Sequence, residues 1–353
     1  MLAGIFYESG KVGVEELPIP KAASTDVVVQ VLRAGICGAD LYAYADNNRL
    51  TCVKQKGDGD ANGEFGHELV GRVCEVGADT KDIKVGDMVW VNPTTAHRTG
   101  MAEGYQGGFS QYMLVEDAAW GYNLWKWDQD VDIDHAALME PLCVGTHGVN
   151  QAKITAGDHV VILGAGPIGL CALSAALQKG CKNPVVIDLS DKRLEAVKVM
   201  GGVPFNSMTD GKMGDFLMNH FGTKFTFFGM PVPDVDAYVD CAGAATLLDQ
   251  ALHLVKDKSR VAIVAGYAKP YELDVSFLGA MQVSITGSRA YETPDIEAAR
   301  DNINNNETNL DPIITHTTKL TPAFEVRLYT LYRQKQSRDI FKDHVLRKMG
   351  AKS

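Results

Sequence analysis

Residues 159–188 read HVVILGAGPIGLCALSAALQKGCKNPVVID, and this stretch decides the fold of the second half of the chain. The segment HVVILG is an apolar run typical of a buried strand, and PVVID at the other end is a second one. The residues between them, GPIGLCALSAALQKG, have the length and composition of a helix. A strand, a helix and another strand in this order predict a parallel βαβ unit.

Three glycines, Gly164, Gly166 and Gly169, follow the first predicted strand and open the helix. The first permits a tight turn, the second lets the backbone approach a pyrophosphate, and the third allows close packing of helix against strand. The helix N-terminus would offer N–H groups and the positive end of its dipole to the phosphates. The GxGxxG pattern occurs by chance in many chains, but its place inside a βαβ unit predicts a dinucleotide site.

Asp188 ends the second predicted strand, about 20 residues after the glycine turn. A carboxylate at this position would accept hydrogen bonds from the adenine ribose hydroxyls and would repel a 2′-phosphate. This favours NAD over NADP as the cofactor. The alternative is an ordinary glycine turn followed by a surface aspartate.

The rest of the chain divides into two parts by its pattern of predicted strands and helices. Up to about Gly148 it reads as short strands broken by glycine, which predicts a small β-rich barrel or sandwich. After Asp158 strands and helices alternate, which predicts a doubly wound α/β domain. The aromatic stretch 222–236, GTKFTFFGMPVPDVD, interrupts this alternation. It is either an inserted loop that faces a neighbouring subunit or a segment that packs within its own domain.

Composition limits the class of protein. A chain of 353 residues with 46% hydrophobic and 22% charged residues is typical of a soluble globular protein with two domains. Its net charge of -10 argues against a nucleic-acid partner and against adhesion to anionic membranes. No stretch resembles a signal peptide, and none approaches the roughly 18 apolar residues of a membrane span. The seven cysteines are scattered without a CxxC pair, which favours a reducing, cytoplasmic location.

Four residues of the first half are candidate metal ligands: Cys37 in AGICGAD, His67 and Glu68 in EFGHELVG, and Glu140 in MEPLCVG. Thiolate, imidazole and carboxylate groups are the ligands of an open catalytic zinc, whose remaining position is left to water or substrate. Taken singly, a lone cysteine is more often a small core residue, and Glu68 has the alternative of a surface charge. Their joint occurrence ahead of a nucleotide domain favours the metal site.

At these motifs the chain resembles the medium-chain zinc alcohol dehydrogenases, and especially their polyol branch, which includes sorbitol and threonine dehydrogenases. The resemblance runs through AGICGAD, GHELVGRVCEVG, GGFSQYMLVE, MEPLCVGTHGV and VVILGAGPIGL. It implies a GroES-like catalytic domain of residues 1–148 and 293–353 and a Rossmann NAD-binding domain of residues 149–292. It further implies a homodimer or homotetramer.

The resemblance also implies roles for single residues. Cys37 and His67 match zinc ligands, and either Glu68 or Glu140 supplies the third. The cofactor contacts implied are Gly164, Gly166, Pro167, Ile168, Gly169, Asp188 and Arg193, the last beside the adenine ribose.

Two departures from the family matter. The loop after VNP carries no cysteine, so we expect one catalytic zinc and no structural zinc, with His97 a surface residue. The hydroxyl residue that relays the alcohol proton in the family is Ala39 here, and a histidine common just downstream is Tyr42. Tyr42, or a water held by Glu140, is therefore expected to carry the proton.

These features predict an enzyme that transfers hydride between a polar secondary alcohol, which carries further hydroxyls, and NAD. A Cys/His/Glu metal shell favours a secondary alcohol such as a polyol or cyclitol, whose neighbouring hydroxyl can bind a carboxylate. Residues 225–228 and Tyr44 support the alternative of an apolar alcohol or ketone pocket. A zinc-free reductase and a non-catalytic NAD(H)-binding protein of the same fold are the remaining alternatives.

Overall fold

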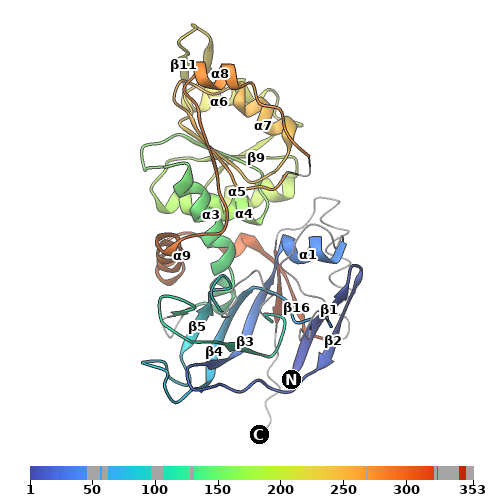
Figure 1. Cartoon of the computed structure of the whole chain (residues 1–353). Coiled ribbons are helices and arrows are strands. Elements are labelled where there is room, and N and C mark those ends of the chain that lie inside the picture. The colour runs from blue at the N-terminus through green and yellow to red at the C-terminus, as the bar shows by residue number, and fades with distance from the viewer. Residues whose placement is uncertain are drawn as a thin grey trace. The chain divides into compact units, whose positions relative to one another are not determined.

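The computed structural model describes residues 1–45, 56–57, 63–96, 107–127, 131–267, 269–321, 324 and 342–346 (Figure 1). By its contacts the chain forms two compact units. The first comprises Met1–Glu140 and Ile314–Ser353, and the second comprises Pro141–Ile313. Among the described residues, no helix is long and apolar enough to cross a membrane.

The first unit is built on a seven-stranded sheet, as the short glycine-bounded strands predict. Its strand order is β16-β17-β3-β4-β5-β7, and β6 also pairs with β3. The strands are β3 (Val27–Ile36), β4 (Glu68–Val76), β5 (Met88–Val91), β6 (Tyr112–Val115), β7 (Leu124–Lys126), β16 (Ile314–Lys319) and β17 (Lys342–Leu346). A separate hairpin, β1 (Leu2–Glu8) and β2 (Lys11–Glu16), and the short helices α1 (Gly38–Ala45) and α2 (Ile133–Ala136) complete the described part.

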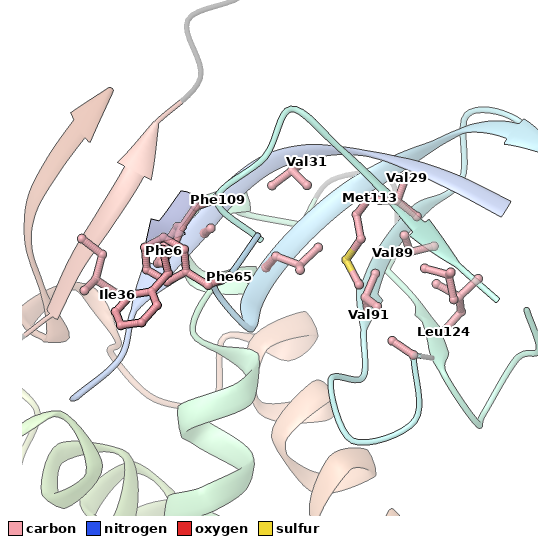
Figure 2. Close-up of a cluster of buried hydrophobic side chains, with 14 of the residues drawn as sticks. Phe6, Val29, Val31, Ile36, Phe65, Val89, Val91, Phe109, Met113 and Leu124 are labelled. Carbon is pink, nitrogen blue, oxygen red and sulfur yellow. The ribbon is translucent and has the colours of Figure 1, made fainter. Parts of the chain in front are cut away.

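The core of this unit positions the chain just before β4. Phe65 is buried, and its ring meets Phe109 edge-on at 4.9 Å between centroids. Figure 2 shows these two rings grouped with Phe6 beside Ile36, while the aliphatic part of the cluster extends away from them. Gly66 follows with φ +94°, and a Cβ there would lie 2.7 Å from the Phe109 ring. Only glycine therefore fits at the turn that separates the core residue Phe65 from His67.

The second unit is a doubly wound domain, as the alternation of strands and helices predicts. Its six parallel strands have the order β10-β9-β8-β13-β14-β15, so the order reverses between β8 and β13. The strands are β8 (Val160–Leu163), β9 (Val185–Asp188), β10 (Val203–Asn206), β13 (Ala237–Asp240), β14 (Arg260–Ile263) and β15 (Ser284–Gly287). Strand β8 is buried along its whole length, because helices cover both faces of the sheet.

The helices of this unit flank the sheet. Helices α4 (Pro167–Gln178) and α5 (Asp191–Val199) lie on one face, and α6 (Met213–Phe221), α7 (Ala245–Leu252) and α8 (Val275–Ala280) lie on the other (Figure 1). The other helical elements are α3 (Met139–Gln151), α9 (Thr293–Asn305) and the 3₁₀ turn η2 (Asp311–Ile313).

The contacts divide the chain after Glu140 and after Ile313, whereas the sequence pattern suggested divisions at 148/149 and 292/293. Helix α9 explains the later second boundary. Its Asn302 amide donates to Ser174 Oγ at 3.0 Å, and its Ala298 carbonyl accepts from Gln178 at 2.9 Å. Both partners lie in α4, so residues 293–313 pack with the nucleotide-type domain.

The aromatic stretch 222–236 forms a hairpin of β11 (Thr223–Phe225) and β12 (Pro231–Pro233). Phe225, Phe227 and Phe228 are 70%, 83% and 59% exposed. These three side chains lie at the surface, whereas Val232 and Val235 of the same stretch are buried, and Val235 belongs to the core of the second unit. Tyr44, in contrast, is buried in the core of the first unit.

Candidate active site

Cys37, His67 and Glu68 are brought together by the pairing of two strands. Strands β3 and β4 are antiparallel, and Gly35 pairs with Glu68. Cys37 lies just past the end of β3, and His67 lies just before the start of β4. Because antiparallel partners run in opposite directions, the residue that follows β3 and the residue that precedes β4 meet at the same end of the strand pair.

The three donor atoms form a compact group. The Cys37 sulfur, a His67 ring nitrogen and a Glu68 carboxylate oxygen all lie within 4.8 Å of one another. His67 and Glu68 are buried, and Cys37 is half-buried. This donor set and this spacing fit a tetrahedral zinc with one position left open. Glu140, at the start of α3, is not in the group of donors within that distance.

The electrostatics of the group also fit a cation. Burial by itself would lower the pKa of His67, but the negative charges of Cys37, Asp40 and Glu140 raise it to about 10. A proton on the imidazole is thus held by the surrounding negative charge, and a metal dication would satisfy the same field. Glu140 is therefore one of the negative charges that act on His67.

Asp40 is a site residue that the sequence alone does not single out. It is buried, and its Oδ2 accepts a 2.7 Å hydrogen bond from the Cys37 backbone N–H. Its Oδ1 lies 3.8 Å from His67 Nδ1. Asp40 therefore fixes the backbone of one candidate ligand and faces another. The signal available in the sequence was an aspartate three residues after Cys37, at the start of a short helix.

The two positions that depart from the proton relay of the family lie on α1, which begins directly after Cys37. Ala39 has no hydroxyl. The side chain of Tyr42 is 57% exposed. His97 and the loop 97–106, on which the expectation about a second zinc depends in part, lie outside the described residues.

The glycine turn after β8 has the geometry that its sequence predicts. Gly164 has φ +95°, and a Cβ at Gly169 would lie 1.8 Å from the Gly164 carbonyl oxygen. At Gly166 a Cβ would meet nothing within 4 Å, so this position opens to free space. Gly166 is the N-cap of α4, and Pro167 and Ile168 are its first residues. The open glycine at a helix N-terminus fits the approach of a pyrophosphate.

Asp188 is fixed beside this turn at the end of β9. Its Oδ2 accepts from the Ala165 N–H at 2.8 Å, and its Oδ1 accepts from the N–H groups of Leu189 and Ser190 at 2.7 and 2.9 Å. Arg193 Nη1 lies 3.7 Å from the same carboxylate. The carboxylate of Asp188 and the guanidinium of Arg193 therefore lie side by side.

Comparison with known proteins agrees with both halves of this arrangement. A family model described as alcohol dehydrogenase GroES-like domain matches residues 23–124, and one described as zinc-binding dehydrogenase matches residues 167–305. The two together match more than half of the chain. The chain belongs to the zinc-dependent medium-chain alcohol dehydrogenase family. This confirms the resemblance found in the sequence, the GroES-like and Rossmann folds, and the assignment as a dehydrogenase.

Individual relatives are distant but cover most of the chain. A D-xylulose reductase of Scheffersomyces stipitis is 29% identical over an alignment of 343 residues that covers 88% of each chain. A sorbitol dehydrogenase of Bacillus subtilis is 28% identical and covers 82% of each chain. Among solved structures, 2R,3R-butanediol dehydrogenase from Bacillus subtilis has a TM-score of 0.83 at 23% identity and covers 98% of this chain and 99% of that one.

The glycine turn yields a stability prediction. Gly169→Ala places a methyl group against the Gly164 carbonyl and should lower the free energy of unfolding by about 1–3 kcal/mol or more. Gly166→Ala is the matched control, because its methyl group enters free space at an allowed φ of -72°. Thermal unfolding without cofactor should separate the two variants. Equal melting temperatures would contradict the packing role assigned to Gly169.

Proposed function

We propose that the chain transfers hydride between a polar secondary alcohol, such as a polyol or cyclitol, and NAD, with one catalytic zinc. The observation that carries the proposal is the Cys37, His67 and Glu68 group in a chain that also has a dinucleotide turn open at Gly166. The printed names of the relatives, D-xylulose reductase and sorbitol dehydrogenase, support a substrate with several hydroxyls.

Cys37, His67 and Glu68 would hold the zinc, which when bound supplies Lewis-acid polarisation of the alcohol oxygen. The compact donor group favours Glu68 as the third ligand, with Glu140 close enough to act on His67 through its charge. Asp40 keeps the Cys37 backbone in place through its hydrogen bond. With the zinc bound, these residues would orient the alcohol for loss of a hydride and a proton.

The second unit would hold the acceptor of the hydride. The N–H groups at the start of α4 would bind the pyrophosphate that approaches Gly166. Asp188 would accept hydrogen bonds from the adenine ribose, with Ile168 and Arg193 as further contacts. Fixing the cofactor in this way orients it without any covalent step by the protein.

The proton released from the alcohol needs a route that does not use residue 39. We propose Tyr42, or a water held by Glu140, as this route. The exposure of Tyr42 would let its hydroxyl exchange with solvent. Tyr42→Phe should then lower kcat and shift its pH profile, and an unchanged kcat and profile would exclude the tyrosine and leave the water.

The metal site predicts one zinc per chain. Cys37→Ala should abolish activity and zinc binding while leaving NADH binding intact, since the thiolate ligand lies in the other unit. Cys74→Ala is the control, because Cys74 is an exposed thiol on β4 outside the donor group. Metal analysis by mass spectrometry gives the stoichiometry, and two zincs per unmodified chain would contradict the proposal.

Cofactor choice is predicted to depend on Asp188. Its charge would face the extra phosphate of NADP, and a like-charge contact of several kcal/mol corresponds to a preference for NAD of about 100-fold or more. Asp188→Ala should reduce this preference, because Arg193 would then meet the 2′-phosphate without the opposing carboxylate. The further change Arg193→Ala should remove that gain. Equal kcat/KM for both cofactors in the unmodified enzyme would refute the assignment.

The substrate class is tested by following NADH formation across sugar alcohols, cyclitols, amino alcohols and simple secondary alcohols. Polyols or cyclitols should give the highest kcat/KM, because an analogue without the second hydroxyl leaves a buried acceptor unpaired. A simple aliphatic alcohol that exceeds every polyol by about tenfold would support the apolar alternative instead. Binding of NADH without turnover of any alcohol would support a non-catalytic role.

We also propose that the chain works as a homodimer or homotetramer in a reducing cytosol. The exposed Phe225, Phe227 and Phe228 support association, since clustered exposed apolar side chains mark contact surfaces. The cysteines of the described residues form no disulfide, which suits a reducing compartment. Analytical ultracentrifugation that gives only the 38.2 kDa monomer would contradict the oligomer.

A further inference from the structure

A buried carboxylate at the end of β13 holds two turns together. Asp240 is 1% exposed. Its Oδ1 accepts from the backbone N–H groups of Ala242 and Gly243 at 3.0 and 3.2 Å, which fixes the turn between β13 and α7. Its Oδ2 accepts a 2.6 Å hydrogen bond from the Tyr267 hydroxyl, which lies in the segment after β14.

These two turns also pack against each other and against the glycine turn after β8. Gly243 has φ +62°, and a Cβ there would lie 2.6 Å from the Gly266 carbonyl oxygen. A Cβ at Gly164 would lie 3.1 Å from Ala242. The turns at the carboxyl ends of β8, β13 and β14 therefore form one tightly packed group, with Asp240 at its centre.

In the Asp240–Tyr267 pair the tyrosine hydroxyl is the donor and the carboxylate is the acceptor. Burial and the neighbouring Asp240 carboxylate both raise the pKa of Tyr267, so its hydroxyl keeps the proton and donates. Burial raises the pKa of Asp240, while its donors from Tyr267, Ala242 and Gly243 oppose that effect. A buried carboxylate costs free energy unless several donors satisfy it, which this arrangement does.

The place of the pair in the sheet indicates its use. Strand order reverses between β8 and β13, and a dinucleotide lies across the carboxyl ends of the strands at such a point. The β8 turn and Asp188 on β9 lie on the side of the adenine half. The turns after β13 and β14 lie on the other side of the reversal.

We propose that Asp240 and Tyr267 are positioning residues for the nicotinamide half of the cofactor. They act by setting the spacing of the two turns that border this half. The inference rests on the proposed dinucleotide site, and it adds a pair of residues that holds one half of that site in shape.

The test compares a whole cofactor with its adenine half. Tyr267→Phe removes only the hydroxyl and should raise the Kd of NADH by about tenfold, as expected for a buried acceptor that loses its donor. The Kd of ADP-ribose, which lacks the nicotinamide, should stay unchanged. Calorimetric titration of the full-length protein measures both values without any turnover.

Tyr271→Phe is the matched control. Its hydroxyl donates a 2.7 Å hydrogen bond to Asp249, so this variant removes a tyrosine–aspartate bond of the same kind at the surface, four residues further along the chain. This variant should leave both dissociation constants unchanged. Asp240→Asn is the second variant: its amide oxygen can still accept from the β13 turn, so it should fold and weaken NADH binding more than ADP-ribose binding.

The possible results distinguish the positioning role of Asp240 and Tyr267 from the proposed cofactor site itself. Equal weakening of NADH and ADP-ribose, or no weakening of either, by Tyr267→Phe and Asp240→Asn would overturn the positioning role. Failure of the unmodified protein to bind ADP-ribose would overturn the proposed cofactor site, and this inference with it.

Discussion

The burial of charged donors at the junction of β3 and β4 is the constraint on which the candidate site depends. Cys37, His67 and Glu68 bring a thiol, an imidazole and a carboxylate within 4.8 Å of one another, largely away from water. Such a group is costly to bury without a compensating positive charge. The negative charges of Cys37, Asp40 and Glu140 raise the pKa of His67 against the effect of burial, so the surroundings favour a positive charge. A zinc ion held by the proposed ligands Cys37, His67 and Glu68 would supply that positive charge.

The rest of each unit keeps its own site in shape. In the first unit the turn at Gly66 allows Phe65 to enter the core while His67 joins the donor group. In the second unit Gly169 packs against the Gly164 carbonyl, which leaves Gly166 as the open position of the turn. In both units a glycine, Gly66 or Gly169, allows the close packing next to the candidate site.

The sequence predicted the fold and most of the candidate site because these depend on local patterns. The glycine spacing around Gly166 and the apolar strands on either side predicted the βαβ unit that contains β8 and β9 of the six-stranded sheet. The role of Asp40 depends on the position of the first turn of α1 relative to His67, which local sequence patterns do not predict. The place of α9 likewise depends on side-chain contacts with α4, such as Asn302 to Ser174, that the sequence alone does not reveal.

The central claim is that Cys37 is a ligand of a four-coordinate metal, and cobalt substitution tests it most directly. Co²⁺ in place of zinc should give the intense visible bands of a tetrahedral ion and a thiolate charge-transfer band in the near ultraviolet. The charge-transfer band should disappear in Cys37→Ser, while the exposed Cys74→Ser leaves the spectrum unchanged. A weak spectrum of six-coordinate cobalt without a thiolate band, in the unmodified protein, would contradict the account.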